Sequence, residues 1–143
     1  MEMKQRYGDA APYGSQHVPD GVDAPGGVFV VAIDEQGVPI GCGGLRGLDE
    51  QICEVKSMFV QASNQGQGTG RALLRFLEEL ARWMGYQRCR LNTGQNQPEA
   101  LSLYRSAGYE PIPAYNKNPL AAYWFEKIVA VEGAWSIAQN RED

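Results

Sequence analysis

A single amphipathic helix constrains the fold of this 143-residue chain more than any other feature. Its apolar residues fall on one stripe at the helical period: Leu73, Leu74, Leu77, Leu80, Ala81 and Met84. Charged residues, among them Glu78, are expected on the opposite face, and Gly85 is expected to end the helix. Strand-like segments, residues 52–60 and 89–93, flank the helix. The pattern therefore predicts a helical crossover between two parallel strands.

The remaining segments predict further strands and one more helix. The expected strands are residues 28–34, 38–48, 52–60, 89–93, 110–113 and 121–129, and the second helix covers 98–107. The first three strands, joined by short turns, indicate an antiparallel meander. Residues 1–27 are interpreted as an irregular lead-in with one short helical turn near residues 4–7, and residues 131–143 as a frayed tail. The whole chain is expected to form a single α+β domain.

Composition excludes several classes of protein. The net charge of −4 and the absence of a basic stripe argue against nucleic-acid binding. His17 is the only histidine and the three cysteines show no paired spacing, so we expect no metal site and predict buried, reduced thiols. No apolar run is long enough to cross a bilayer and no signal peptide is visible, which predicts a cytoplasmic protein without a membrane partner.

The segment "SNQGQGTGRALL", residues 63–74, places three glycines directly before the helix. A helix N-terminus presents unpaired amides, and glycine lets a phosphate approach the backbone, so the loop is a candidate anion cradle. A flexible connection between strand and helix is the alternative. The loop lacks the Gly-Lys-Ser/Thr ending of a Walker motif, and Leu73 occupies the third glycine position of a dinucleotide fingerprint.

The spacing Gln65-x-x-Gly68-x-Gly70 and the later segment "PEALSLYRSAGYEPIP" resemble the GNAT N-acetyltransferase superfamily. The resemblance extends over about residues 28–127. It implies a GNAT-like fold, with a central mixed, mostly antiparallel twisted sheet flanked by helices and a shortened N-terminal strand and helix region. It also implies acetyl-CoA as the co-substrate.

The resemblance assigns a set of residues to the cofactor. They are Met58, Phe59, Val60, Gln65, Gly66, Gln67, Gly68, Thr69, Gly70, Arg71 and Gln97. The loop would hold the pyrophosphate largely through main chain, and an amide near Met58 would stabilise the thioester oxygen. Core packing is the alternative for residues 58–60, and helix capping is the alternative for Gln97.

Two side chains are candidates for proton transfer. Glu54 is the candidate base, because it precedes the cofactor segment and the two-residue period puts it on the same face as Met58. A solvated carboxylate or a partner of Lys56 is the alternative. Tyr104 matches the family's tyrosine that protonates the leaving thiolate, and an aromatic that only packs along the cofactor is the alternative.

The resemblance implies transfer of an acetyl group from acetyl-CoA to a primary amine of a small molecule or peptide, by direct attack in a ternary complex. The loop at residues 115–119 is expected to contribute to the acceptor pocket, and Asn92 stands where relatives carry glutamate. The short N-terminal region would leave a sheet edge uncovered, which predicts a homodimer. The same shortness favours the alternative function, a non-catalytic acyl-CoA-binding module.

Overall fold

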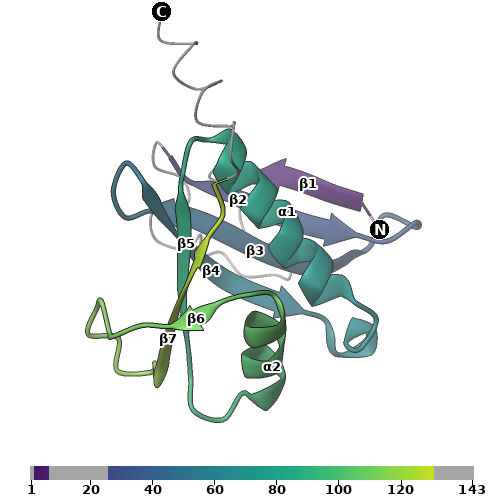
Figure 1. Ribbon diagram of the computed structural model, residues 1–143. Coiled ribbons are helices and arrows are strands. Elements are labelled where there is room, and N and C mark those ends of the chain that lie inside the picture. Colours follow the sequence, from purple (N-terminus) through teal and green to yellow (C-terminus); the bar gives the residue numbers. More distant parts are fainter. Residues whose placement is uncertain (1, 7–25, 131–143) are drawn as a thin grey trace, which may run out of the picture.

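A seven-stranded sheet in the order β1-β2-β3-β4-β5-β7-β6 forms the frame of the protein (Figure 1). The computed structural model describes residues 2–6 and 26–130. The strands are β1 (Glu2–Arg6), β2 (Val28–Ile33), β3 (Pro39–Gly47), β4 (Ile52–Val60), β5 (Arg88–Thr93), β6 (Glu110–Pro111) and β7 (Tyr123–Ile128). The helices are the short 3-10 helix η1 (Ala62–Asn64), α1 (Thr69–Trp83) and α2 (Pro98–Ser106). The mixed α+β fold, the meander and the crossover are confirmed.

One pair of strands is parallel, and it stays together only briefly. β4 and β5 pair through Ile52, Cys53 and Glu54, opposite Arg88, Cys89 and Arg90. Both strands continue, but no residue of β5 pairs with β4 beyond Glu54. The strands therefore diverge in a V, which is visible in Figure 1, and Glu54 lies at its vertex.

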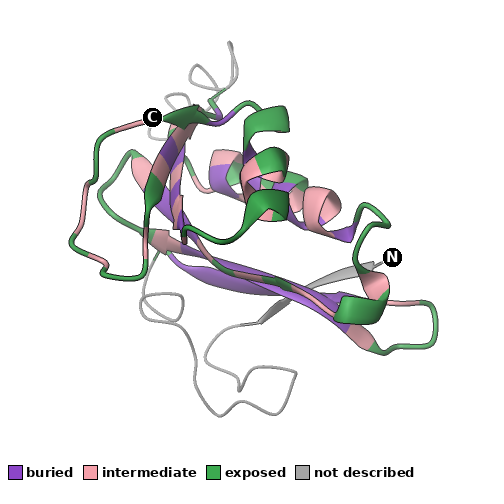
Figure 2. Ribbon diagram, turned by 90° about the horizontal axis from the view of Figure 1, so that it is seen from below, coloured by how far each residue is buried: buried purple, intermediate pink, exposed green. Residues whose placement is uncertain are grey.

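Both helices lie on one side of the sheet (Figure 2). The leucine stripe of α1 is buried there against apolar residues of β4, β5 and β7, including Val55, Leu91 and Phe125. Two glycines of β3 allow this close approach. A Cβ at Gly43 would stand 2.9 Å from Leu77 Cδ1, and one at Gly41 would stand 2.9 Å from Leu73 Cδ1. The amphipathic helix is thus confirmed, and it ends as expected before Gly85, whose φ is 95°.

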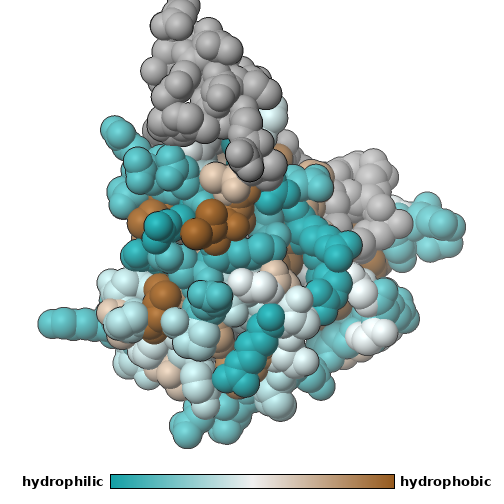
Figure 3. All heavy atoms as spheres, viewed as in Figure 1, coloured by the Kyte–Doolittle hydropathy of each residue, from teal (hydrophilic) through white to brown (hydrophobic). Residues whose placement is uncertain are grey.

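The prediction that Glu78 lies on the outer face of the helix is wrong. Glu78 is only 3% exposed, and Lys127 of β7 donates a hydrogen bond to its Oε1 at 2.9 Å. A carboxylate can be buried when a cation from another element meets it, and such a partner is not visible in the periodicity of one helix. The rest of the helix-bearing face is largely hydrophilic, with only small, separate apolar patches (Figure 3).

The expectation of an irregular N-terminal segment is also wrong for residues 2–6. They form β1, which pairs antiparallel with β2 from Glu2 opposite Ile33 to Arg6 opposite Phe29. The pairing is set by β2 rather than by a strong strand signal in "EMKQR" itself. The predicted frayed tail at residues 131–143 and the rest of the lead-in, with His17, lie outside the described residues.

The three cysteines are buried and free, as predicted. Of the helices in the described part of the chain, none has both the length and the apolar character that crossing a bilayer requires.

Candidate active site

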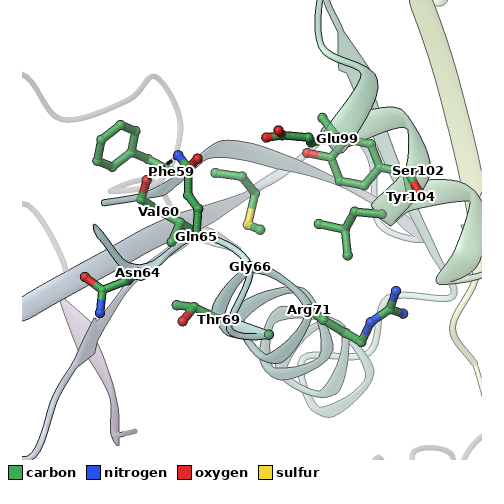
Figure 4. A pocket seen from close by; sticks show the side chains of 15 residues that line it. Phe59, Val60, Asn64, Gln65, Gly66, Thr69, Arg71, Glu99, Ser102 and Tyr104 are labelled. Carbon is green, nitrogen blue, oxygen red and sulfur yellow. Dashed lines mark hydrogen bonds between the residues drawn. The ribbon is translucent and has the colours of Figure 1, made fainter. Parts of the chain in front are cut away.

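A cleft of about 450 Å³ opens where the end of β4, the glycine loop and the two helices meet (Figure 4). This volume is in the usual range for a small-molecule site. The residues that line it are Met58, Phe59, Val60, Asn64, Gln65, Gly66, Gly68, Thr69, Gly70, Arg71, Glu99, Ala100, Ser102, Leu103 and Tyr104. The lining thus runs along the chain from the end of β4, through the glycine loop, to the first turn of α1.

The glycine loop lines this cleft at the start of α1. Gly66 and Gly68 have φ values of 78° and 83°, in the left-handed region that favours glycine. Gly68 is the N-cap of α1, and the first helical bond runs from the Ala72 amide to the Gly68 carbonyl at 3.0 Å. The amides of residues 69–71 thus have no acceptor inside the helix, at the positive end of its dipole. The loop can therefore act as an anion cradle.

One side chain fixes the loop to the strand before it. Gln65 Nε2 donates a hydrogen bond to the Val60 carbonyl at 3.2 Å. Arg71 is turned elsewhere, because its guanidinium donates to the Ser106 hydroxyl at the end of α2. What Arg71 offers the loop is thus chiefly its amide.

A β-bulge interrupts β4 just before the cleft. Ser57 has a φ of 57°, unusual for a residue with a side chain, and the pairing with β3 shifts between Cys42 and Gly44. Beyond the bulge, Met58 and Val60 pack on the helix side with Val55. The bulge inserts one residue into the alternation, so side chains after it change face.

The predicted shared face of Glu54 and Met58 is therefore wrong. Met58 lines the cleft beside the helices, whereas Glu54 meets Arg46 and Tyr115 on the other face of the sheet. Glu54 is 3% exposed, so it is not a solvated carboxylate either. It lies at the vertex of the V, as the last β4 residue paired with β5.

Tyr104 enters the cleft from α2. Its ring is buried against Tyr109 and Phe125, with centroid distances of 6.0 and 6.4 Å, and Figure 4 shows its hydroxyl directed into the cleft on the side of Glu99. Within residues 26–130 this hydroxyl has no hydrogen-bond partner. Burial raises the pKa of Tyr104 above its ordinary value, so the phenol keeps its proton near neutral pH.

A second polar cluster occupies the opposite face of the sheet at the vertex. Glu54 accepts a hydrogen bond from Arg46 Nη2 at 2.9 Å and another from the Tyr115 hydroxyl at 2.6 Å. Asn92 of β5 donates to the Tyr115 oxygen at 3.4 Å and accepts from Asn118 Nδ2 at 3.0 Å. The loop between β6 and β7 thus covers the vertex, and a contribution of residues 115–119 to an acceptor pocket stays a prediction.

The structure brings together most of the predicted site residues but not all. Met58, Phe59, Val60, Gln65, Gly66, Gly68, Thr69, Gly70, Arg71 and Tyr104 line the cleft. Glu54, Gln67 and Gln97 do not. The side-chain amide of Gln67 donates to the Ser63 carbonyl, and Oε1 of Gln97 accepts a hydrogen bond from Thr93 Oγ1 at 2.8 Å. Gln97 is the N-cap residue of α2 but makes no capping hydrogen bond through its side chain.

Sequence reasoning missed several residues at the site. Asn64, Glu99, Ser102 and Leu103 line the cleft and lie within the two segments quoted above, but no role was assigned to them; their closeness in sequence to the loop and to Tyr104 could have suggested them. Arg46 was missed as well. Its place opposite Glu54 in the β3–β4 hairpin could have been read from the register of two adjacent strands.

Comparison with known proteins gives a consistent result. Residues 25–111 match the family model described as an acetyltransferase (GNAT) domain. An "IAA acetyltransferase" of Azospirillum brasilense is 34% identical over 129 residues, which are 85% of this chain and 83% of that protein. The N-acetyltransferase YjgM of Escherichia coli is 35% identical over 91 residues, which are 62% of this chain and only 54% of that protein.

Two solved structures illustrate the similarity of fold. The IAA acetyltransferase from Bacillus cereus has a TM-score of 0.70 at 20% identity, and the match covers 89% of this chain and 98% of that protein. A GNAT family acetyltransferase from Elizabethkingia anophelis, with acetyl-CoA bound, has a TM-score of 0.60 at 23% identity and covers 73% of this chain and 77% of its own.

Proposed function

The chain belongs to the GNAT acetyltransferase family, and from this premise we propose that it acetylates a primary amine of a small molecule or peptide by direct attack in a ternary complex. Acetyl-CoA is the co-substrate of the family, and the enzyme is an acetyl-CoA-dependent acyltransferase. One observation supports the proposal above the others. The glycine loop lines one cleft together with Met58, Phe59 and Val60, the β4 residues that lie beyond the last pairing with β5.

The cleft suits a long ligand with a charged and an uncharged part. At the loop, amides of residues 66–71 would hold a diphosphate, since an anion is favoured at a helix N-terminus. Beyond the loop, the cleft is lined by the apolar side chains of Met58, Val60 and Leu103, which suit an uncharged arm. Beyond Glu54 the β4 backbone has no partner in β5, so an extended arm would pair with it as a strand does.

The bulge at Ser57 is our candidate for the source of the oxyanion contact. A bulge leaves a backbone group outside the regular ladder and redirects it. The predicted donor is the amide near Met58, and an amide fixed in place before the reaction stabilises charge that develops on the thioester oxygen.

The reaction needs a base for the amine and an acid for the leaving sulfur. An alkylammonium has a pKa of about 10.4, so only roughly one amine in a few thousand is neutral at pH 7. Glu54, buried at the vertex, is the proposed base. Tyr104 is the proposed acid, because its hydroxyl faces the cleft and burial raises its pKa, which keeps the phenol protonated.

Calorimetric titration with acetyl-CoA, combined with free-thiol release across amines, tests the proposal. The panel contains a polyamine, an aminoglycoside and a lysine peptide, since a cationic acceptor would suit the net charge of −4. We expect acetyl-CoA to bind and at least one amine to release thiol. Binding without turnover on any amine would instead support the non-catalytic acyl-CoA-binding module, which family membership now disfavours.

A cytoplasmic location and a homodimer remain predictions. The dimer was argued from a missing first strand, and β1 now occupies that edge beside β2. Light scattering of the purified protein gives the mass in solution directly.

A further inference from the structure

We propose that Tyr115 is a proton-transfer residue, which takes the proton of the acceptor amine on its phenol oxygen while passing its own proton to Glu54. On this view Glu54 acts as the base only through the phenol. The inference rests on the proposed acetyl transfer and deepens it, because it identifies the group that meets the amine.

Both carboxylate oxygens of Glu54 accept a hydrogen bond. Arg46 Nη2 donates to Oε1 at 2.9 Å, and the Tyr115 hydroxyl donates to Oε2 at 2.6 Å. The second distance is typical of a charge-assisted hydrogen bond from a hydroxyl to a carboxylate. Glu54 itself is 3% exposed. Tyr115 is only half-buried and is thus easier for an amine to reach than Glu54.

The loop that carries Tyr115 is anchored over the vertex by hydrogen bonds. Trp124 Nε1 donates to Asn116 Oδ1 at 2.9 Å, and Asn118 Nδ2 donates to Asn92 Oδ1 at 3.0 Å. The Ala122 amide reaches the Thr93 carbonyl at 2.9 Å. These bonds attach both sides of the loop to β5 and β7. Such anchoring holds a phenol over the vertex, 61 residues along the chain from its carboxylate partner.

Charged side chains from neighbouring strands surround the phenol of Tyr115. From β5, the Arg90 guanidinium lies 5.3 Å from the centre of the Tyr115 ring, and Arg90 is itself paired with Glu126 of β7 at 2.7 Å. From β4 and β3 come Glu54 and its partner Arg46. Burial, followed by the hydrogen bond to Glu54, raises the pKa of Tyr115 well above its ordinary value. The proton that the relay needs is thus on the phenol at neutral pH.

Tyr115 also lies at the point where β4 and β5 separate. Glu54 is the last β4 residue paired with β5, so Tyr115 covers the point at which the strands separate. The cleft residues of β4 begin four positions later, at Met58. The proposed relay thus lies on the face opposite the helices, and the cleft lies on the helix face.

The protons and electrons balance as follows. One proton of the ammonium moves to the Tyr115 oxygen while the Tyr115 proton moves to Glu54 Oε2. The nitrogen lone pair then forms the C–N bond, and the C–S bond breaks with its electron pair on sulfur. Tyr104 gives its proton to this sulfur and is reprotonated by the second proton that nitrogen loses. The relay returns the first proton to water after the amide leaves.

The test measures kcat/KM against pH for the wild type, Tyr115→Phe, Glu54→Gln and the double variant, with the panel amine that reacts fastest. Tyr123→Phe, a tyrosine at the start of β7 that is 36% exposed, is the matched control. We expect both single variants to lose about 10²-fold near pH 7, which is the usual contribution of a general base. Their rates should then rise about tenfold per pH unit, following the free amine. The double variant should be no worse than the poorer single one, because the two groups act as a unit.

3-Fluorotyrosine at position 115 keeps the ring and the hydrogen bond but makes the phenol more acidic, so it serves if Tyr115→Phe fails to fold. A relay predicts that the pH at which kcat/KM levels off will move, whereas a packing role leaves it fixed. A wild-type pH profile in these variants, or a loss confined to KM, overturns the relay and leaves acetyl transfer intact. If wild type binds acetyl-CoA yet acetylates no amine, the acetyl-transfer proposal fails, and the relay fails with it.

Discussion

Gly68→Ala separates the strain of the glycine loop from its role in binding. Gly68 has a φ of 83°, and a Cβ placed there meets no atom within 4 Å, so the cost comes from the backbone alone. An alanine in this left-handed region costs about 1–2 kcal/mol, of which the less flexible unfolded chain returns about half. The net loss of about 1 kcal/mol in the free energy of unfolding lowers Tm by about 3 °C for a chain of this length.

The effect on acetyl-CoA should be larger. If the loop relaxes away from the left-handed region, its amides turn, and one hydrogen bond to a charged phosphate is worth about 1.5–3 kcal/mol. Losing one such bond weakens binding about 10- to 100-fold. Calorimetric titration with acetyl-CoA measures this Kd, and thermal unfolding measures the stability.

Gly37→Ala is the matched control for this experiment. Gly37 also has a φ of 83° and open space at its Cβ, but it lies in the turn between β2 and β3. It should lose a similar Tm and keep its affinity for acetyl-CoA. Equal affinities in the two variants would refute the argument that the amides of this loop bind the cofactor.

Three further variants test the neighbouring elements. Tyr104→Phe should lower kcat about 10²-fold in the thiol-release assay while calorimetry finds the acetyl-CoA Kd unchanged, because only the proton is removed. Lys127→Met should cost about 2–3 kcal/mol in urea unfolding, because it leaves the buried carboxylate of Glu78 unpaired, and adding Glu78→Gln should recover much of the loss. Tyr109→Phe should be neutral or slightly stabilising, because within the described residues its buried hydroxyl has no hydrogen-bond partner. Burial raises the pKa of Tyr109, so above pH 10 the unfolded chain releases protons that the folded one keeps, and wild-type stability falls as pH rises; urea midpoints at pH 9 and 11 should differ less in this variant.

The predictable part of this molecule is the part governed by local patterns. The leucine stripe of α1 and the glycine spacing before it follow rules that act over a few residues, and both were found from the sequence. The antiparallel meander and the parallel crossover followed from turn lengths and from the intervening helix, whereas the position of β7 between β5 and β6 was not predicted. Each of the predicted features is decided within one element or between adjacent elements.

The errors have a different origin, since each depends on how one element meets another in the folded sheet. Glu78 can be buried because Lys127, 49 residues away in the chain, donates a hydrogen bond to it. Residues 2–6 form a strand because β2 offers an edge. The bulge at Ser57 depends on how β4 meets β3, and its residue type gives no warning of a positive φ. A one-residue insertion reverses the face of every later side chain, so this single feature separated Met58 from Glu54.

In the proposed mechanism, that separation allows one strand to contact both the amine and acetyl-CoA. If β4 alternated without interruption, Glu54 and Met58 would share a face, and base and cofactor arm would compete for the same space. With the bulge, β4 directs Glu54 toward Tyr115 on one face and Met58 into the cleft on the other. The vertex, where β5 stops pairing with β4, is at Glu54. In the proposed mechanism an amine held at Tyr115 and a thioester held along β4 meet there. Deletion of Ser57, which removes the extra residue and restores regular pairing, should abolish transfer while leaving the glycine loop able to bind acetyl-CoA.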